Sequence, residues 1–465
     1  MESGGSTIRH RVVIVGGGFG GVYTAIHLAK LWRGRNDVSV TLVSRDNFFL
    51  MTPFLFEAGS GVLDPRHAVT AIRRLLDPPA RFVEADVEGI DFDRKAVTVR
   101  HAPDTEPYDL PYDQLVLSLG GVTNLRIIPG SEHAMTFKTL ADAIYWRNHV
   151  IDMFEYADTR EHDEGRRIPM SFAIVGAGLV GVELMGELTS FVRNISRSYP
   201  NARRTTPRFY LIEAGPHILP EMERDLADYA AKVLRDRGVD VRTGTPVRRI
   251  EPGRLHLPDG SAIEAGTIVL AAGVAPNPML ASFPLEKDRK GRLVVDGAMR
   301  SASRRDVWAI GDCASIPDPE GKPYPQLAQH ALREARVLAR NITEVLRGTG
   351  KKPEPFVYRT LGTLASLGHY DGVGRVMKVK LRGFPAWWVW RSYYLMQMPR
   401  FERKLRIILD WTVALFFRND IVKLDLFGQE HPIRQKRVPP AFAGGDGATP
   451  SPSPAVESPA FAASR

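Results

Sequence analysis

Two glycine clusters are the strongest chemical signal in this sequence. Each lies directly after an apolar, β-branched run and opens an amphipathic stretch, in residues 11–30 and 171–190. The spacing G-x-G-x-x-G fits a dinucleotide pyrophosphate, which then lies at a helix N-terminus where free N–H groups favour negative charge. The glycines are Gly16, Gly18 and Gly21 in the first cluster and Gly176, Gly178 and Gly181 in the second. They predict two dinucleotide sites; the alternative for either cluster is a tight turn without a ligand.

Polar residues at predicted strand ends are the second group of candidates. Glu213 in RFYLIEAG occupies the place of the acid that binds a ribose. Its carboxylate would accept hydrogen bonds from ribose hydroxyls and repel a 2′-phosphate, which favours NADH over NADPH. In the first unit Ser44, followed by Arg45, takes this place, and a serine binds a ribose only weakly. The alternative for Glu213 is an ordinary acid at a strand end.

Asp312, in DVWAIGDCAS, ends a further predicted strand. Its carboxylate can accept hydrogen bonds from a flexible polyol such as the ribitol of FAD. The alternative is an N-cap aspartate without a ligand. Beside two dinucleotide fingerprints, the FAD interpretation is favoured.

Composition limits the class of protein. The chain has 465 residues, enough for two or three domains, a net charge of +9 and a single cysteine, Cys313. One cysteine excludes a disulfide framework and a mechanism that uses a cysteine pair. The positive charge suggests an anionic partner, but the basic residues are not arranged as in a known nucleic-acid reader, so we expect no nucleic acid. We find no His/Cys cluster that predicts a metal site, no secretory signal and no apolar run of about 18–20 residues that predicts a transmembrane helix.

The elements that must position these residues are strand–turn–helix units. Two such openings imply an α/β fold with two Rossmann-like dinucleotide-binding domains. Residues 112–121 and 266–278 are buried strands at matching places in the two halves, and 326–346 is a helix. The tail from about Arg437 is rich in Pro, Ala, Ser and Gly, a composition typical of disorder.

These motifs, taken together, resemble the type II NADH dehydrogenases, the single-chain NADH:quinone oxidoreductases among the flavoproteins with two dinucleotide-binding domains. The resemblance covers roughly residues 10–428. The glycine motifs belong to the wider superfamily. The narrower signal is C-terminal, in GTLASLGHYDGVG and LRGFPAWWVWRSYYL.

By this resemblance the first fingerprint binds FAD and the second binds NADH. The segment Asn47–Glu57 lies beside the isoalloxazine ring, and Glu183 lies near the nicotinamide with Glu187 one turn behind it. The alternative for these two acids is a solvated acidic face. The implied FAD-side residues are Gly16, Gly18, Gly20, Gly21, Ser44, Arg45, Asn47, Thr52, Gly120, Asp312 and Gln329. The implied NADH-side residues are Gly176, Gly178, Gly181, Glu183, Glu213 and Gly273, and Glu183 and Gln329 are the expected catalytic residues.

One departure from the family concerns the electron acceptor. The family's quinone-side motif is Ala-Gln-x-Ala-x-Gln, and here the first glutamine is Gln329 while Arg333 replaces the second. The quinone could therefore be held differently, or the acceptor could differ from a usual quinone. His330 is an additional polar candidate, although an ordinary helix-surface histidine is the favoured interpretation.

Residues 384–420 combine aromatic, basic and strongly apolar residues. They predict two helices broken near Pro399 that lie in a membrane interface and meet anionic lipid. The alternatives are a core helix pair or a homodimer interface, and a dimer could use part of the same surface.

We therefore expect an FAD-dependent enzyme that transfers hydride from NADH to flavin and two electrons to a membrane quinone, without proton pumping. It would be peripheral on the cytoplasmic face of the cell membrane. The alternatives are a reductase of the same fold with another lipid-soluble acceptor, or a membrane-bound NADH-sensing flavoprotein with little turnover. The predicted domains are FAD-binding in 1–165 and 291–350, NADH-binding in 166–290, C-terminal with membrane-anchor helices in 351–436, and a disordered tail in 437–465.

Overall fold

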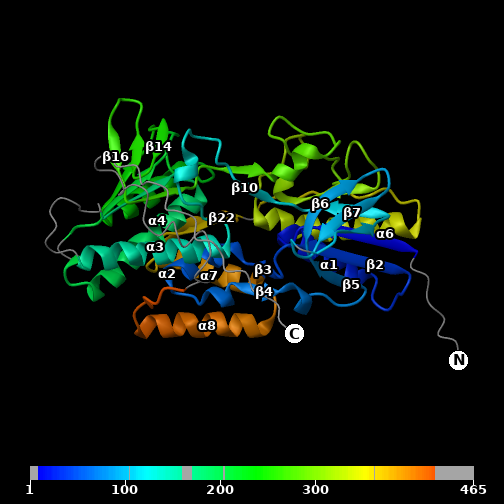
Figure 1. Cartoon of the computed structure of the whole chain (residues 1–465), viewed down its shortest axis with the longest axis horizontal. Coiled ribbons are helices and arrows are strands. Elements are labelled where there is room, and N and C mark those ends of the chain that lie inside the picture. Colours follow the sequence, from blue (N-terminus) through cyan, green and yellow to red (C-terminus); the bar gives the residue numbers. More distant parts are fainter. Residues whose placement is uncertain (1–8, 104, 160–169, 203–204, 361, 425–465) are drawn as a thin grey trace, which may run out of the picture.

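Two parallel β-sheets form the frame of the molecule (Figure 1). The computed structural model describes residues 9–103, 105–159, 170–202, 205–360 and 362–424. The first sheet has the order β20 (Val307–Ala309), β9 (Gln114–Leu117), β1 (His10–Val15), β2 (Val38–Ser44) and β5 (Ala80–Glu84). The second has the order β13 (Val239–Arg242), β12 (Arg208–Ile212), β11 (Ser171–Val175) and β17 (Thr267–Leu270). The predicted α/β fold is confirmed.

Each glycine cluster joins a central strand to a helix. β1 leads into α1 (Phe19–Leu31), and β11 leads into α4 (Leu179–Ile195). Both strands end in apolar runs that are almost fully buried, as expected for parallel strands covered on both faces. α1 packs against α6 (Ala328–Arg347), whose inward side chains join the core of the first sheet. The other long helices are α3 (Leu140–Thr159) and α5 (Arg224–Asp236), which join the core of the second sheet.

Smaller sheets attach to both halves. One consists of β6 (Asp86–Asp91), β7 (Ala96–Arg100) and β8 (Tyr108–Pro111), and the other of β14 (Arg249–Glu251), β15 (Arg254–His256) and β16 (Ala262–Glu264). The two halves are joined by an antiparallel pair, β10 (Gly121–Thr123) with β18 (Val274–Pro276). The remaining short pairs are β3 (Phe48–Leu50) with β4 (Val69–Ala71) and β19 (Leu293–Val294) with β21 (Ala314–Ser315).

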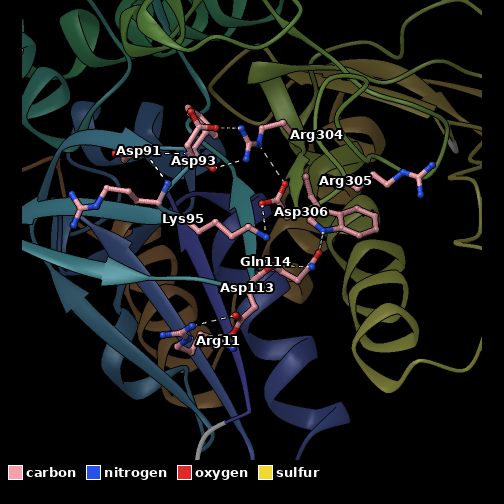
Figure 2. Close-up of polar contacts among 12 residues, drawn as sticks. Arg11, Asp91, Asp93, Lys95, Asp113, Gln114, Arg304, Arg305 and Asp306 are labelled. Carbon is pink, nitrogen blue, oxygen red and sulfur yellow. Dashed lines mark hydrogen bonds and ion pairs between the residues drawn. The ribbon is translucent and has the colours of Figure 1, made fainter.

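A polar cluster fastens the β6–β7 turn to the segment that enters β20 (Figure 2). The Arg304 guanidinium donates to the Phe92 carbonyl at 2.6 Å and lies 2.8 Å from an Asp93 carboxylate oxygen. Lys95 lies 3.2 Å from Asp306, and the Trp308 indole N–H donates to Gln114 at 2.7 Å. These contacts hold the edge strand β20 in place, and with it the residues that follow this strand.

The C-terminal part carries a three-stranded antiparallel sheet followed by two helices. The sheet is β22 (Gly362–Ser366), β23 (Gly372–Val376) and β24 (Val379–Arg382), and α7 (Phe384–Gln397) packs on it. α8 (Phe401–Phe416) runs along the lower edge of the molecule in Figure 1. The predicted helix break near Pro399 is confirmed. The predicted tail 437–465 lies outside the described residues. Among the helices of the described ranges, none is long and apolar enough to span a bilayer.

α8 is amphipathic, and its polar side chains contact the protein while most of its large apolar side chains are exposed. Asp410 accepts a hydrogen bond from the Asp64 backbone N–H at 3.1 Å and lies 2.5 Å from the His67 imidazole, and Arg403 donates to the Arg66 carbonyl. On this helix and the residue after it only Ile407 is fully buried, whereas eight large apolar side chains are exposed. They are Phe401, Leu405, Ile408, Leu409, Val413, Leu415, Phe416 and Phe417.

Candidate functional site

The first glycine loop forms a tight turn that leaves open space beside the start of α1. Gly16 has φ +114°, and a Cβ there would lie 2.1 Å from the Ser118 carbonyl oxygen. A Cβ on Gly21 would lie 1.9 Å from the Gly16 carbonyl oxygen, so only glycine allows α1 to approach β1 this closely. Gly18 precedes α1 and has open space around it, with nothing within 4 Å of a Cβ. An anionic group can therefore reach the free N–H groups of the first turn of α1.

Other predicted FAD-side residues lie around this loop. Ser44 ends β2, the neighbour of β1, and its hydroxyl would be 2.5 Å from a Cβ on Gly17. A Cβ on Gly20 would be 2.5 Å from the Ser118 hydroxyl. Arg45 is exposed and pairs loosely with Asp46, whereas the Asn47 carbonyl accepts from the Ile72 N–H and Thr52 opens a short 3₁₀ turn. The structure thus brings Ser44 to the loop, whereas the exposed Arg45 pairs with Asp46.

Asp312 lies at the same edge of the first sheet. It follows β20, and parallel pairing of β20, β9 and β1 brings the ends of these strands together with Gly120 and Gly16. Burial raises the pKa of the Asp312 carboxyl, and Lys138, whose ammonium lies 3.9 Å away, opposes that rise. A half-buried carboxylate beside an open glycine loop fits the polyol of FAD. Sequence reasoning missed Lys138, because nothing in its local pattern distinguishes it from a surface lysine.

Cys313, next to Asp312, is a structural residue. Its thiol is fully buried and donates to the carbonyls of Ile310 at 3.2 Å and Leu117 at 3.4 Å. Burial raises the pKa of the thiol to about 12, so it stays protonated at physiological pH. A buried, protonated thiol of this kind is unsuited to act as a nucleophile.

The second glycine loop repeats the geometry of the first. Gly176 has φ +101°, and a Cβ on Gly181 would lie 1.9 Å from the Gly176 carbonyl oxygen. Glu213 ends β12, beside β11, and its carboxylate accepts from the backbone N–H groups of Ala177 and Gly215, both at 2.7 Å. Gly273, with φ +109°, follows β17 and leads into β18. The structure therefore brings Glu213 to the loop, as the sequence predicted.

The two acids of α4 are buried. Glu183 accepts a hydrogen bond from the Ser366 N–H at 3.0 Å, and neither it nor Glu187 is more than 7% exposed. Burial, reinforced by neighbouring carboxylates, raises the pKa of Glu183 to about 8 and that of Glu187 to about 7. The alternative of a solvated acidic face is therefore wrong for both. A buried acid with such a pKa in a candidate site can hold or release a proton near neutral pH.

A third acid, Glu57, was not singled out from the sequence. It lies on α2 (Leu55–Ser60), is 1% exposed, and forms an ion pair with Arg391 at 2.7 Å. The Trp411 indole N–H donates to its other oxygen at 2.6 Å. An arginine 334 positions away in the chain gives no local signal, so only the fold reveals this pair.

The predicted acceptor-side residues lie in the first turn and a half of α6. Tyr358 lies 3.4 Å from the Gln329 side-chain oxygen, and Gln329 lies 3.5 Å from the Gly362 carbonyl. The Arg333 guanidinium stacks 4.4 Å above the Tyr358 ring and donates to the Gln329 backbone carbonyl at 2.7 Å. The interpretation of His330 as a surface histidine is wrong. It is 1% exposed between the rings of Tyr324 and Tyr358, because the helix turns this face toward the core.

A small cavity adjoins this helix start. Its lining includes Gly311, Tyr324 and the buried Glu334, whose carboxylate accepts from the Gly311 N–H at 2.8 Å. Burial raises the pKa of Glu334 to about 7. Within the described residues, no group of three or more His, Cys, Asp or Glu side chains is arranged to hold a metal ion.

Comparison with known proteins gives the family. Residues 10–335 match the family described as pyridine nucleotide-disulphide oxidoreductase, and residues 360–420 match the NDH2 C-terminal domain. The chain is 31% identical over 385 residues to a type II NADH:quinone oxidoreductase of Staphylococcus aureus (strain MSSA476), covering 81% of this chain and 92% of that one. It is 30% identical over 416 residues to a probable NADH dehydrogenase of Dictyostelium discoideum, covering 88% and 90%.

Solved structures agree on the fold. NDH2 from Plasmodium falciparum in complex with NADH has a TM-score of 0.82 at 18% identity, covering 89% of this chain and 100% of that chain. The family match extends from β1 into the first turns of α6, and the C-terminal match covers the segment from β22 to α8. The chain therefore belongs to the pyridine nucleotide-disulphide oxidoreductases and, within them, to the type II NADH:quinone oxidoreductases.

Proposed function

We propose that this protein is a flavoenzyme that oxidises NADH and reduces a quinone in the membrane, without pumping protons. The observation that carries the proposal is the pairing of two dinucleotide loops. β10 and β18 follow directly from Gly120 and Gly273 and pair with each other, so the carboxyl ends of the two sheets adjoin. Ligands of open α/β sheets bind at that edge, and two such ligands would there meet at their reactive ends.

FAD, when bound, supplies the hydride acceptor and the two-electron donor of the reaction. The residues around the first loop fit it. Gly16, Gly18 and Gly21 allow a pyrophosphate to reach the start of α1. Asp312 would accept hydrogen bonds from the ribitol, and the Lys138 ammonium 3.9 Å away favours the ionised form of that carboxylate. Residues 1–165 and 291–350 would form this FAD domain, since β20 pairs with β9.

NADH would bind at the second loop, in a domain of residues 166–290. Glu213 has carboxylate lone pairs left beyond its two backbone hydrogen bonds and can accept from ribose hydroxyls. A 2′-phosphate there would meet that negative charge, so the site prefers NADH over NADPH. Glu183, near the nicotinamide, would exchange a proton near neutral pH, and its burial keeps water away from the reacting atoms.

Gln329 would bind the quinone head group through its amide. Arg333 would not take over the role of the second glutamine of the family motif, because its guanidinium is held over the Tyr358 ring. Instead it fixes the Gln329 backbone and the tyrosine whose hydroxyl contacts the Gln329 side chain. Because of this substitution a second acceptor class remains open, namely another lipid-soluble electron carrier.

α7 and α8 would dock the enzyme on the membrane, in a C-terminal domain of residues 351–436. The exposed apolar side chains of α8, with Phe384, Trp388 and Met396 of α7, face away from the protein. Arg406 and Arg418 lie exposed beside them and can meet anionic headgroups. We propose a peripheral position on the cytoplasmic face of the membrane, where a long-tailed quinone can enter from the bilayer. The alternative is that a second copy of the chain binds to part of this surface and forms a homodimer.

The test uses the FAD-loaded protein in anaerobic stopped flow. NADH should bleach the flavin absorbance rapidly, and a short-chain quinone added in a second mix should restore it. Bleaching without restoration by quinones points to another acceptor. Slow bleaching with no response to any acceptor favours the NADH-sensing alternative, and absence of bound FAD would overturn the proposal.

A further inference from the structure

Three carboxylates share one buried region between α2 and α4. Glu57 comes from α2, and Glu183 and Glu187 come from successive turns of α4. None of the three is more than 7% exposed. α2 packs against α4, and the negative charge of Glu57 raises the pKa of both α4 acids. Three buried carboxyl groups in one place require a counter-charge or protonation, because low-dielectric surroundings strongly disfavour each unpaired negative charge.

Arg391 of α7 supplies this compensation. Its Nε lies 2.7 Å from Glu57 Oε1, and its guanidinium lies 4.3 Å from the Trp387 ring centroid and 4.4 Å from that of Trp411. The guanidinium makes cation–π contacts with both indole rings, and the Trp411 indole N–H also donates to Glu57. The position of this positive charge is therefore set by α7 and α8 together.

The other groups around the cluster add little positive charge. From α4 come the two glutamates themselves, from the end of α5 comes Arg237, which acts weakly on Glu187, and from α7 comes the Tyr394 hydroxyl. Glu183 receives the Ser366 N–H. Arg391 is the larger of the two positive influences on Glu187, ahead of Arg237.

We propose that Arg391 is a positioning residue for the reaction: it is the counter-ion of the Glu57–Glu183–Glu187 cluster, and through it the seating of α7 and α8 sets the charge of the α4 acids. The inference deepens the proposed function, in which these acids lie on the NADH side and the same two helices dock on the membrane. It gives the C-terminal helices a role inside the site as well as at the lipid surface. Removing the guanidinium leaves Glu57 unpaired, so the cluster must take up a proton or open to water.

The proton affinities of the α4 acids agree with this arrangement. After burial, the Glu57 carboxylate is the next cause that raises the pKa of Glu187, and Arg391 is the first that lowers it. Removal of Arg391 should therefore raise the pKa of Glu187, and removal of the Glu57 charge should lower the pKa of both α4 acids. An opposite charge within about 4–6 Å typically shifts a carboxyl pKa by about 1–3 units.

The test is an infrared titration of the FAD-loaded protein carrying isotope-labelled glutamate, followed through the carbonyl band of protonated carboxyls. Arg391→Gln should move the midpoint of the buried glutamates upward by about 1–3 pH units. Arg391→Lys keeps the charge and should shift it by much less. Glu57→Gln should move the midpoint downward, and the double variant Glu57→Gln/Arg391→Gln should lie between the two single variants. The alkaline displacement in Arg391→Gln should appear again in the pH dependence of NADH oxidation.

An unchanged midpoint in Arg391→Gln, or an equal shift in Arg391→Lys, would overturn the inference, since the first excludes charge coupling and the second indicates altered packing. If Arg391→Gln does not fold, the midpoints of Glu57→Gln and of the double variant test the inference instead. An unshifted midpoint in Glu57→Gln would also overturn the inference. The titration needs neither NADH nor quinone. The titration can therefore still be interpreted if the proposed reaction with NADH or quinone proves wrong.

Discussion

Glu183 makes the stability of the folded protein depend on pH. Its pKa is raised from the ordinary value of 4.5 to about 8. Between these pH values the native carboxyl keeps its proton while the unfolded one loses it, so the unfolded state binds fewer protons and stability falls as pH rises. We expect this one group to lower the free energy of unfolding by about 1.4 kcal/mol per pH unit in that window. Below pH 4.5 and above pH 8 its contribution is flat.

The measurement is urea unfolding at several pH values for the wild type and Glu183→Gln. The glutamine variant should lose this share of the slope. Glu320→Gln, on an exposed turn, is the matched control and should keep the wild-type slope. Identical slopes in wild type and Glu183→Gln would contradict the assignment of a protonated buried acid.

Glu213 should determine the choice between nicotinamide cofactors. Glu213→Arg replaces a hydrogen-bond acceptor with a cation that attracts a 2′-phosphate. We expect the ratio of kcat/KM for NADH over NADPH to fall roughly 10- to 100-fold, the equivalent of one hydrogen bond to a charged group. Steady-state kinetics with both nucleotides checks this. Glu213→Gln, which keeps the shape, should fall between, and a full NADH preference in Glu213→Arg would exclude Glu213 as the ribose ligand.

At the residue scale, sequence patterns identified groups whose partners lie in the same strand–turn–helix unit. Gly21 and Gly181 lie against the first glycine of their own loop, and Glu213 ends the strand next to that loop and binds the Ala177 N–H, so local geometry fixes all three. Glu57, Lys138 and the burial of His330 could not be predicted, since their partners come from distant segments. Long-range pairing leaves no periodic trace in the chain.

At the element scale, the important property of α8 is the orientation of its polar and apolar sides. Its polar residues Arg403, Asp410 and Trp411 bind segments near α2, and its apolar residues point outward. The sequence predicted two helices with a break, because proline and the apolar run mark them locally. It could not predict that the polar side faces the protein, since that depends on polar groups of residues 57–67 that the fold brings to this helix.

The outward face of α8 should control lipid binding. Leu409→Glu/Val413→Glu places two charges among side chains that are 54% and 55% exposed, so the fold should tolerate them. Because an exposed side chain of this size gains about 1.5–3 kcal/mol on full burial in hydrocarbon, losing two should weaken binding to anionic liposomes at least tenfold. Liposome co-sedimentation measures this, with Tyr108→Glu on β8 as control. A variant that pellets like the wild type, or a dimer that dissociates instead, would assign this face to another occupant.

At the scale of the whole molecule, the return of the chain to its first sheet depends on a polar cluster far from the nucleotide loops (Figure 2). Arg304 joins the β6–β7 turn to the residues before β20. Arg304→Ala should lower the free energy of unfolding by about 1–2 kcal/mol, mostly through the lost bond to the Phe92 carbonyl, since the Asp93 pair is exposed. Urea unfolding at fixed flavin loading checks this.

The neighbouring Arg305 is the matched control, because its side chain points away from the cluster in Figure 2. Arg305→Ala removes the same charge and should change stability by less than about 0.5 kcal/mol. Equal losses in the two variants would mean that net charge, not the cluster, is responsible.

The sealed thiol of Cys313 gives the molecule a practical property. The chain has no other cysteine, and this one is buried and protonated. Alkylating labels and spin probes would therefore find no native site to modify. A single cysteine introduced along the outer ridge of α8 would report its depth in a lipid vesicle against a silent background.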